Sequence, residues 1–226
     1  MANTLDIHIF DQKSDLIQQV TQSILEDIRH YVNVFGDARI LLSGGSTPGP
    51  VYKELDTHIS NLQVIIGLVD ERYVAFESEY SNERLIRECF PQLMNVSGKL
   101  KGMVYDLNDE HANIGRVAEE YRIFSERTDI VLLGMGEDGH FASIFPNDPA
   151  SELALQESNQ SIRSTRAPNY PNQRITWDLK SLCQARTAYL VITGEKKLDL
   201  LLDSTLNLPI HHLLQANPEL KIYHSK

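Results

Sequence analysis

The stretch that decides the fold is DIVLLGMGEDGHFASIFP, residues 129–146. Its first part, 129–134, is a short apolar run that ends in glycine, which is the pattern of a buried parallel strand. Two more glycines and then His140 follow. Glycines at the carboxyl end of a strand let the chain turn sharply and let a ligand approach the backbone. Ligands of open α/β sheets bind at that edge, so the stretch predicts a histidine at a ligand-binding site.

Strands and helices alternate on both sides of this stretch. Weak alternation predicts an edge strand at 5–10, and further strands are predicted at 38–42, 64–69, 103–105, 129–134, 162–165, 174–177 and 187–193. Helical spacing predicts helices that begin at Ser14 and Ser81 as N-caps, and further helices at 110–124, at 181–185 and after Gly194. The segment after Pro146, beginning with 147–149, is expected to be irregular. The alternation predicts an α/β fold with a mostly parallel, Rossmann-like sheet and helices on both faces. Without an internal repeat or long linker, residues 1–226 are expected to form a single domain.

Three other junctions between strands and helices carry residues suited to an anion. Ser43-Gly-Gly-Ser-Thr-Pro48 can present backbone N–H groups and hydroxyls, with the proline in the first helical turn, although it also fits a plain strand–helix turn. Asp70-Glu71-Arg72 follows the strand at 64–69. Gly194-Glu195-Lys196-Lys197 places lysines at a helix start, where they oppose the helix dipole. An anion bound there would explain that cost.

Two stretches resemble known functional motifs but do not match them fully. Residues 134–139 form a literal G-x-G-x-x-G, but Glu137 and Asp138 would lie where a pyrophosphate should bind, and Pro146 interrupts the helix that should follow. A dinucleotide site is therefore disfavoured. The loop at Ser46 resembles a nucleophile elbow but lacks the second glycine of G-x-S-x-G. Ser46 is accordingly expected to bind phosphate rather than to attack the substrate.

Composition excludes several classes of function. The net charge of −10 argues against nucleic acid and anionic membranes as partners. No apolar stretch reaches the length of a membrane span, and residues 1–6 do not resemble a secretory signal, so a cytoplasmic protein is expected. Cys89 and Cys183 are expected to be two buried thiols. The histidines other than His140 show no ligand spacing, so no metal site is expected.

Several motifs, in their order along the chain, resemble the 6-phosphogluconolactonase family, which is related to the glucosamine-6-phosphate isomerase/deaminase fold. They are SGGSTP at 43–48, DER at 70–72, SN at 81–82, GMGEDGHFASIFP at 134–146, RIT at 174–176 and GEKK at 194–197. The resemblance implies a fold of the sugar-phosphate isomerase/lactonase type. It also implies a cytoplasmic enzyme of the pentose phosphate pathway that hydrolyses 6-phospho-D-glucono-1,5-lactone to 6-phosphogluconate without a cofactor.

Details within that superfamily favour a lactonase. A deaminase more usually carries an aromatic residue in place of Arg72 and an Asn-Glu-Pro ending where this chain has FASIFP. One position departs from the family, because many members carry a lysine at the position that matches Asn169 of this chain. Arg166 or Arg174 is expected to supply that charge. An isomerase/deaminase of the same fold and a non-catalytic sugar-phosphate-binding protein stay open as alternatives.

The residues and the resemblance together predict a site. His140 is expected to be the general base that deprotonates water, with Asp138 orienting it. Arg72 is expected to contact the phosphate or the developing oxyanion, and Asp70 to have a polar or orienting role. The residues expected to bind the substrate and its phosphate are Gly44, Gly45, Ser46, Thr47, Arg72, Arg174, Lys197 and Arg166. The expected partner is a phosphorylated sugar lactone, bound by a monomer or a homodimer.

Overall fold

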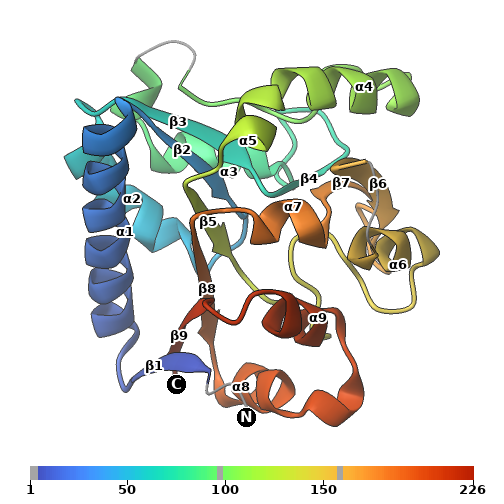
Figure 1. The fold of residues 1–226 in the computed structure, drawn as a ribbon. Helices are drawn as coiled ribbons and strands as arrows, with labels where there is room; N and C mark the ends of the chain where they lie inside the picture. The colour runs from blue at the N-terminus through green and yellow to red at the C-terminus, as the bar shows by residue number, and fades with distance from the viewer. Residues whose placement is uncertain (1–4, 96–98, 157–159) are drawn as a thin grey trace.

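A six-stranded sheet forms the centre of the computed structural model, which describes residues 5–95, 99–156 and 160–226 (Figure 1). Its strands, in spatial order, are β1 (Asp6–Phe10), β9 (Lys221–Ser225), β8 (Thr187–Thr193), β5 (Ile130–Leu133), β2 (Ala38–Leu42) and β3 (Val64–Leu68). Every neighbouring pair is parallel. The predicted α/β fold with a parallel sheet is confirmed.

The burial of each strand depends on its position in the sheet. β5 occupies a central position and is buried at all of its residues, which explains its unbroken apolar run. β1 lies at the edge and is largely exposed, as its weak alternation predicts. Helices α1 and α2 cover one side of the sheet, and α7 and α9 lie on the other (Figure 1).

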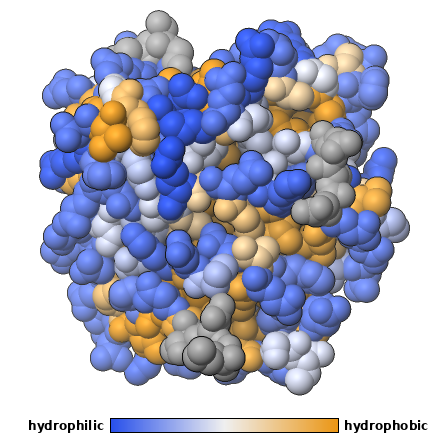
Figure 2. Space-filling model, viewed as in Figure 1, coloured by the Kyte–Doolittle hydropathy of each residue, from blue (hydrophilic) through white to orange (hydrophobic). Residues whose placement is uncertain are grey.

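The helices pack through apolar stripes. In α1, residues Leu16, Val20, Ile24 and Ile28 recur every four positions and are fully buried. The helices are α1 (Lys13–Phe35), α2 (Gly49–Ile59), α3 (Asn82–Cys89), α4 (Glu110–Glu120), α5 (Arg122–Glu126), α6 (Pro149–Leu155), α7 (Leu179–Cys183), α8 (Glu195–Leu202) and α9 (Pro209–Ala216). No helix in the described ranges is long and apolar enough to cross a bilayer. Polar residues cover most of one face, with apolar residues in groups between them (Figure 2).

A second, antiparallel sheet of three strands lies beside the first. Its order is β4 (Asp70–Arg72), β7 (Gln173–Trp177) and β6 (Ile162–Arg166). Only Val69 separates β3 of the large sheet from β4 of the small one. The buried Trp177 joins the two, because its backbone N–H donates to Val69 O and its indole N–H to Leu68 O, each at 3.2 Å.

Local hydrogen bonds overturn two of the predicted elements. The predicted strand at 103–105 is a loop, because the side chain of Asn113 takes the backbone groups that a neighbouring strand would use. Its Oδ1 accepts from Tyr105 N at 2.7 Å, and its Nδ2 donates to Met103 O at 2.9 Å. The predicted helix at 110–124 is split into α4 and α5 at Tyr121, whose backbone leaves the helical region.

Three helix starts test the capping predictions. Ser81 caps α3 as expected, since its side chain accepts from Arg84 N. Ser14 does not cap α1, because the helix begins at Lys13 and Ser14 lies in its first turn. The segment after Pro146 is not irregular throughout, because Asp148 caps α6 and Pro149 opens it. α9 and β9 had no counterpart among the predicted elements.

The two cysteines are both free thiols. Cys89 is buried as predicted, whereas Cys183 is only partly buried, so the prediction of two buried thiols is half correct. Burial raises the pKa of the Cys183 thiol to about 11.

Candidate active site

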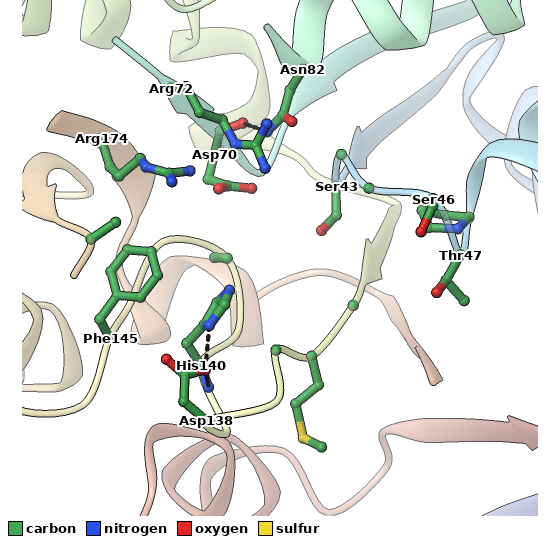
Figure 3. Close-up of a pocket in the computed structure, with 18 of the residues that line it drawn as sticks. Ser43, Ser46, Thr47, Asp70, Arg72, Asn82, Asp138, His140, Phe145 and Arg174 are labelled. Carbon is green, nitrogen blue, oxygen red and sulfur yellow. Dashed lines mark hydrogen bonds and ion pairs between the residues drawn. The ribbon is translucent and has the colours of Figure 1, made fainter. Parts of the chain in front are cut away.

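A cavity of about 330 Å³ lies where the carboxyl ends of the parallel strands meet the small sheet (Figure 3). This size lies within the range of pockets for small molecules. Its walls come from the loops that follow β2 and β5, from β4 and β7, from the β6–β7 hairpin and from α8. The predicted site residues that line it are Gly44, Gly45, Ser46, Thr47, Asp70, Arg72, Asp138, His140, Arg174 and Lys197. The fold thus brings together motifs that are far apart in the sequence.

Two glycines shape the turn that carries His140. Gly139 has a φ of +77°, a conformation that L side chains rarely adopt. Gly136 N donates to His140 O at 2.8 Å, which closes the turn. A Cβ atom on Gly136 would overlap the His140 ring, so only glycine lets the imidazole lie over this backbone.

Asp138 fixes the orientation of the imidazole. Its Oδ1 lies 2.5 Å from His140 Nδ1 and accepts from the His140 backbone N–H at 3.2 Å. Partial burial acts to raise the pKa of Asp138, but the bonds and charge from His140 outweigh it and lower the pKa overall. The opposite edge of the ring faces the cavity (Figure 3). Phe145 packs against the ring with 4.6 Å between centroids. This is the arrangement of an oriented histidine that can exchange a proton with a ligand.

Two arginines lie side by side on the small sheet. Arg72 of β4 and Arg174 of β7 are partners in the antiparallel register, and both line the cavity. Burial lowers the pKa of Arg174, and the charge of Arg72 lowers it further, against the opposing effect of Asp70 and Glu71. Like charges in directly opposed positions destabilise a sheet. An anion in the cavity would relieve that repulsion.

Each arginine uses one donor on a backbone carbonyl. Arg72 Nη1 donates to Tyr80 O at 2.6 Å, and Arg174 Nε donates to Pro171 O at 2.9 Å. Arg72 Nε is buried and has no hydrogen-bond partner in the described part of the chain. The guanidiniums therefore keep donors that a ligand can use.

Asp70 joins β4 to the loop that carries His140. Its carboxylate accepts from Ser143 Oγ at 2.5 Å, and its backbone O accepts from Asn82 Nδ2 at 2.9 Å. The residue is buried, yet it lines the cavity. This placement fits the predicted polar or orienting role.

The loop 43–48 leads into the N-terminus of α2. Gly45 has a φ of +106°, and a Cβ on Gly44 would overlap the side chain of Asn82, so both positions require glycine. Ser46 is exposed at the mouth of the cavity. Pro48 is the N-cap residue and not, as predicted, part of the first helical turn. The helix N-terminus adds a partial positive charge to this wall.

The two lysines of α8 differ in their surroundings. Lys196 is exposed and donates to Glu137 Oε2 at 2.9 Å. Lys197 lines the cavity, and burial lowers its pKa although Glu137 acts in the opposite direction. A cation that is partly desolvated beside a cavity is suited to bind an anion.

Arg166 does not join this group. It lies exposed at the end of β6 and is absent from the described residues that line the cavity. Asn169 does line it, together with Ala167 and Pro168, so the position that departs from the family lies in the wall itself.

The residues that sequence reasoning missed include two polar residues of the wall and one supporting residue. Ser43 and Asn82 line the cavity, but Asn82 could be read only as the residue after a helix cap. Glu71 is almost fully buried and accepts from the backbone of Arg72, Asn82 and Glu83 and from Ser81 Oγ. Burial raises the pKa of Glu71 to about 7, against the effect of these backbone donors. Glu71 therefore links Arg72 to the start of α3, and no sequence motif indicates that role.

Several known proteins are similar to this chain over most of its length. A family model for glucosamine-6-phosphate isomerases/6-phosphogluconolactonase matches residues 11–218. A 6-phosphogluconolactonase of Rhizobium meliloti is 27% identical, covering 96% of this chain and 97% of its own. A probable 6-phosphogluconolactonase 2 of Oryza sativa is 30% identical, covering 85% of this chain and 74% of its own.

The fold has solved counterparts. The crystal structure of a 6-phosphogluconolactonase from Shewanella baltica superposes with a TM-score of 0.87 at 30% identity and covers 100% of both chains. No group of His, Cys, Asp or Glu side chains among the described residues is placed to hold a metal ion. The family resemblance predicted from the motifs is confirmed, and the chain belongs to the glucosamine-6-phosphate isomerase/6-phosphogluconolactonase family.

Proposed function

We propose that the chain hydrolyses 6-phospho-D-glucono-1,5-lactone to 6-phospho-D-gluconate, in the oxidative branch of the pentose phosphate pathway. The family match and the names of its relatives support the reaction. The observation that carries the proposal is the placement of His140, held by Asp138, in one cavity with Arg72, Arg174 and Lys197. A base and several cations in one cavity suit an ester that carries a phosphate.

The proposed reaction begins at the free edge of the imidazole. With the Nδ1 proton directed at Asp138, His140 Nε2 accepts a proton from a water molecule whose oxygen bonds to the lactone carbonyl carbon. The carbonyl oxygen becomes an oxyanion, which a guanidinium donor of Arg72 stabilises. The bond between that carbon and the ring oxygen then breaks, and the ring oxygen takes the proton from the imidazolium. Water is the only co-substrate.

The phosphate is proposed to bind to hydroxyl and cationic groups of the cavity wall. The N-terminus of α2, the hydroxyls of Ser46 and Thr47, and the cationic groups of Lys197 and Arg174 offer donors and positive charge in the cavity. The formal net charge of the chain is −10, so these local cations must outweigh a repulsive overall field.

The test is acid release from freshly generated phosphogluconolactone, corrected for spontaneous hydrolysis. His140→Ala is expected to lower kcat by roughly 10²- to 10⁴-fold, the usual contribution of a general base, with KM nearly unchanged. His58→Ala is the matched control, because His58 is exposed in the last turn of α2 and outside the cavity. A His140→Ala variant with near-normal kcat would contradict the base assignment.

Two other outcomes would replace the proposal. Ammonia release from glucosamine 6-phosphate would indicate a deaminase, although Arg72 stands where deaminases more usually carry an aromatic residue. Binding of 6-phosphogluconate in a thermal-shift assay without any lactone turnover would indicate a non-catalytic binding protein.

A further inference from the structure

Two exposed tyrosines meet near the cavity. Tyr80 belongs to the loop between β4 and α3, and Tyr170 belongs to the β6–β7 hairpin. Their rings pack edge to face, with 5.5 Å between centroids and an interplanar angle of 89°. Tyr170 is 73% exposed, so burial in the core does not account for its position. The ring contact joins two loops that are distant in the sequence.

Both loops hold an arginine of the cavity. Tyr80 itself supplies the carbonyl that accepts from Arg72 Nη1. Pro171, the residue after Tyr170, supplies the carbonyl that accepts from Arg174 Nε. Each ring therefore lies on, or directly beside, the residue that restrains one guanidinium.

The β6–β7 hairpin is also part of the cavity wall. Ala167 and Asn169 line the cavity, and the loop is closed by Asn172, whose backbone O accepts from Ala167 N at 2.8 Å. Asn172 Nδ2 in turn donates a hydrogen bond to Ala167 O at 2.9 Å. A shift of this hairpin would move the wall and the acceptor of Arg174 together.

We propose that Tyr80 and Tyr170 form an aromatic bridge that positions Arg72 and Arg174 for an anionic ligand. The like charges of the two guanidiniums repel each other, and each guanidinium is restrained by a carbonyl on a surface loop. Joining the loops opposes their separation and keeps both cations beside the ligand. The tyrosines are positioning residues, and this role rests on the proposed function of the cavity.

The experiment uses the full chain with Tyr170→Ala. KM for the lactone and the Kd for inorganic phosphate, measured by calorimetry, are expected to rise roughly 2- to 10-fold, the range of an edge-to-face contact. Tyr170→Phe keeps the ring and is expected to restore both values. Phe76→Ala is the matched control, because Phe76 is exposed on the same loop as Tyr80 but packs under Arg87.

The double variant Tyr80→Ala/Tyr170→Ala is expected to bind phosphate no more weakly than the poorer single variant, because both changes remove one contact. Tyr170→Ala with the same KM and phosphate Kd as Phe76→Ala would overturn the bridge, as would wild-type protein that binds no phosphate. Wild-type protein that binds phosphate without hydrolysing the lactone would refute the proposed function alone, and the phosphate Kd values would still decide the role of the tyrosines.

Discussion

Lys197→Ala, compared with Lys196→Ala, gives the sharpest test of how the cavity binds phosphate. The two lysines are neighbours on the first turn of α8 and carry the same charge. Lys196 is exposed and paired with Glu137, whereas Lys197 lines the cavity. The pair therefore separates the effect of losing a charge from the effect of losing a ligand contact.

The expected size of the effect follows from the kind of contact. A hydrogen bond to a charged group contributes about 1.5–3 kcal/mol, which corresponds to roughly 10- to 150-fold in affinity. Lys197→Ala is expected to raise KM by that factor, with kcat little changed, because the phosphate lies away from the reacting carbonyl. Lys196→Ala is expected to change KM little, because exposed ion pairs are screened by solvent.

The pH dependence supplies an independent readout. Burial lowers the pKa of Lys197 below that of an ordinary lysine. The attraction to phosphate is present while Lys197 is protonated and is lost as pH rises through this lowered pKa, and bound phosphate shifts the loss to higher pH. Lys197→Arg is expected to keep the affinity for 6-phosphogluconate at alkaline pH, measured by calorimetry. Equal KM values for Lys197→Ala and Lys196→Ala would refute the reasoning and move the phosphate elsewhere.

Three further changes test the rest of the cavity. Gly136→Ala is expected to displace the His140 ring and to lower kcat by roughly 10-fold or more, with circular dichroism confirming an intact fold; normal kinetics would mean that the backbone yields easily. Asp138→Asn is expected to lower kcat by roughly 10²- to 10⁴-fold, because an amide N–H donor favours the imidazole tautomer whose Nε2 cannot accept a proton; an unchanged pH–rate profile would contradict this. Arg174→Gln is expected to weaken binding of 6-phosphogluconate by roughly 10-fold or more in calorimetry, and Arg166→Gln to leave it unaltered; similar losses in both would show that the exposed arginine also contacts the ligand.

The sequence predicted the parts of the fold that local pattern determines. The predicted strands at 38–42 and 129–134 became interior strands of the sheet, and each contains an apolar run, at 40–42 and 130–133, of the kind that strands buried on both faces need. Parallel strands also place their carboxyl ends at one edge, so the loops that were predicted separately necessarily lie close together. The predicted strand at 103–105 failed because its backbone groups bond to Asn113, a partner that no periodicity reveals. β9 was missed because it buries polar residues, including His224.

The choice between Arg166 and Arg174 shows more clearly what the sequence could not predict. Arg166 pairs with Gln173 in the β6–β7 register, while Arg174 pairs with Thr165 on one side and with Arg72 on the other. Neighbouring positions on a strand point to opposite faces, so a register difference of one residue decides which arginine reaches the cavity. Composition and spacing do not contain that information. Asn82 was missed for a similar reason, since its role depends on contact with Gly44 in another loop.

The single residue between β3 and β4 has a consequence for catalysis. With Val69 bonded to Trp177, the small sheet has little freedom to rotate against the large one. Arg72 and Arg174 belong to the small sheet and His140 to the loop after β5, so this connection fixes where the two cations lie relative to the imidazole before any substrate binds. Dipoles that are fixed during folding need no reorganisation when negative charge develops. In the proposed reaction, the arginines therefore lower the barrier to hydrolysis without any rearrangement of the two sheets.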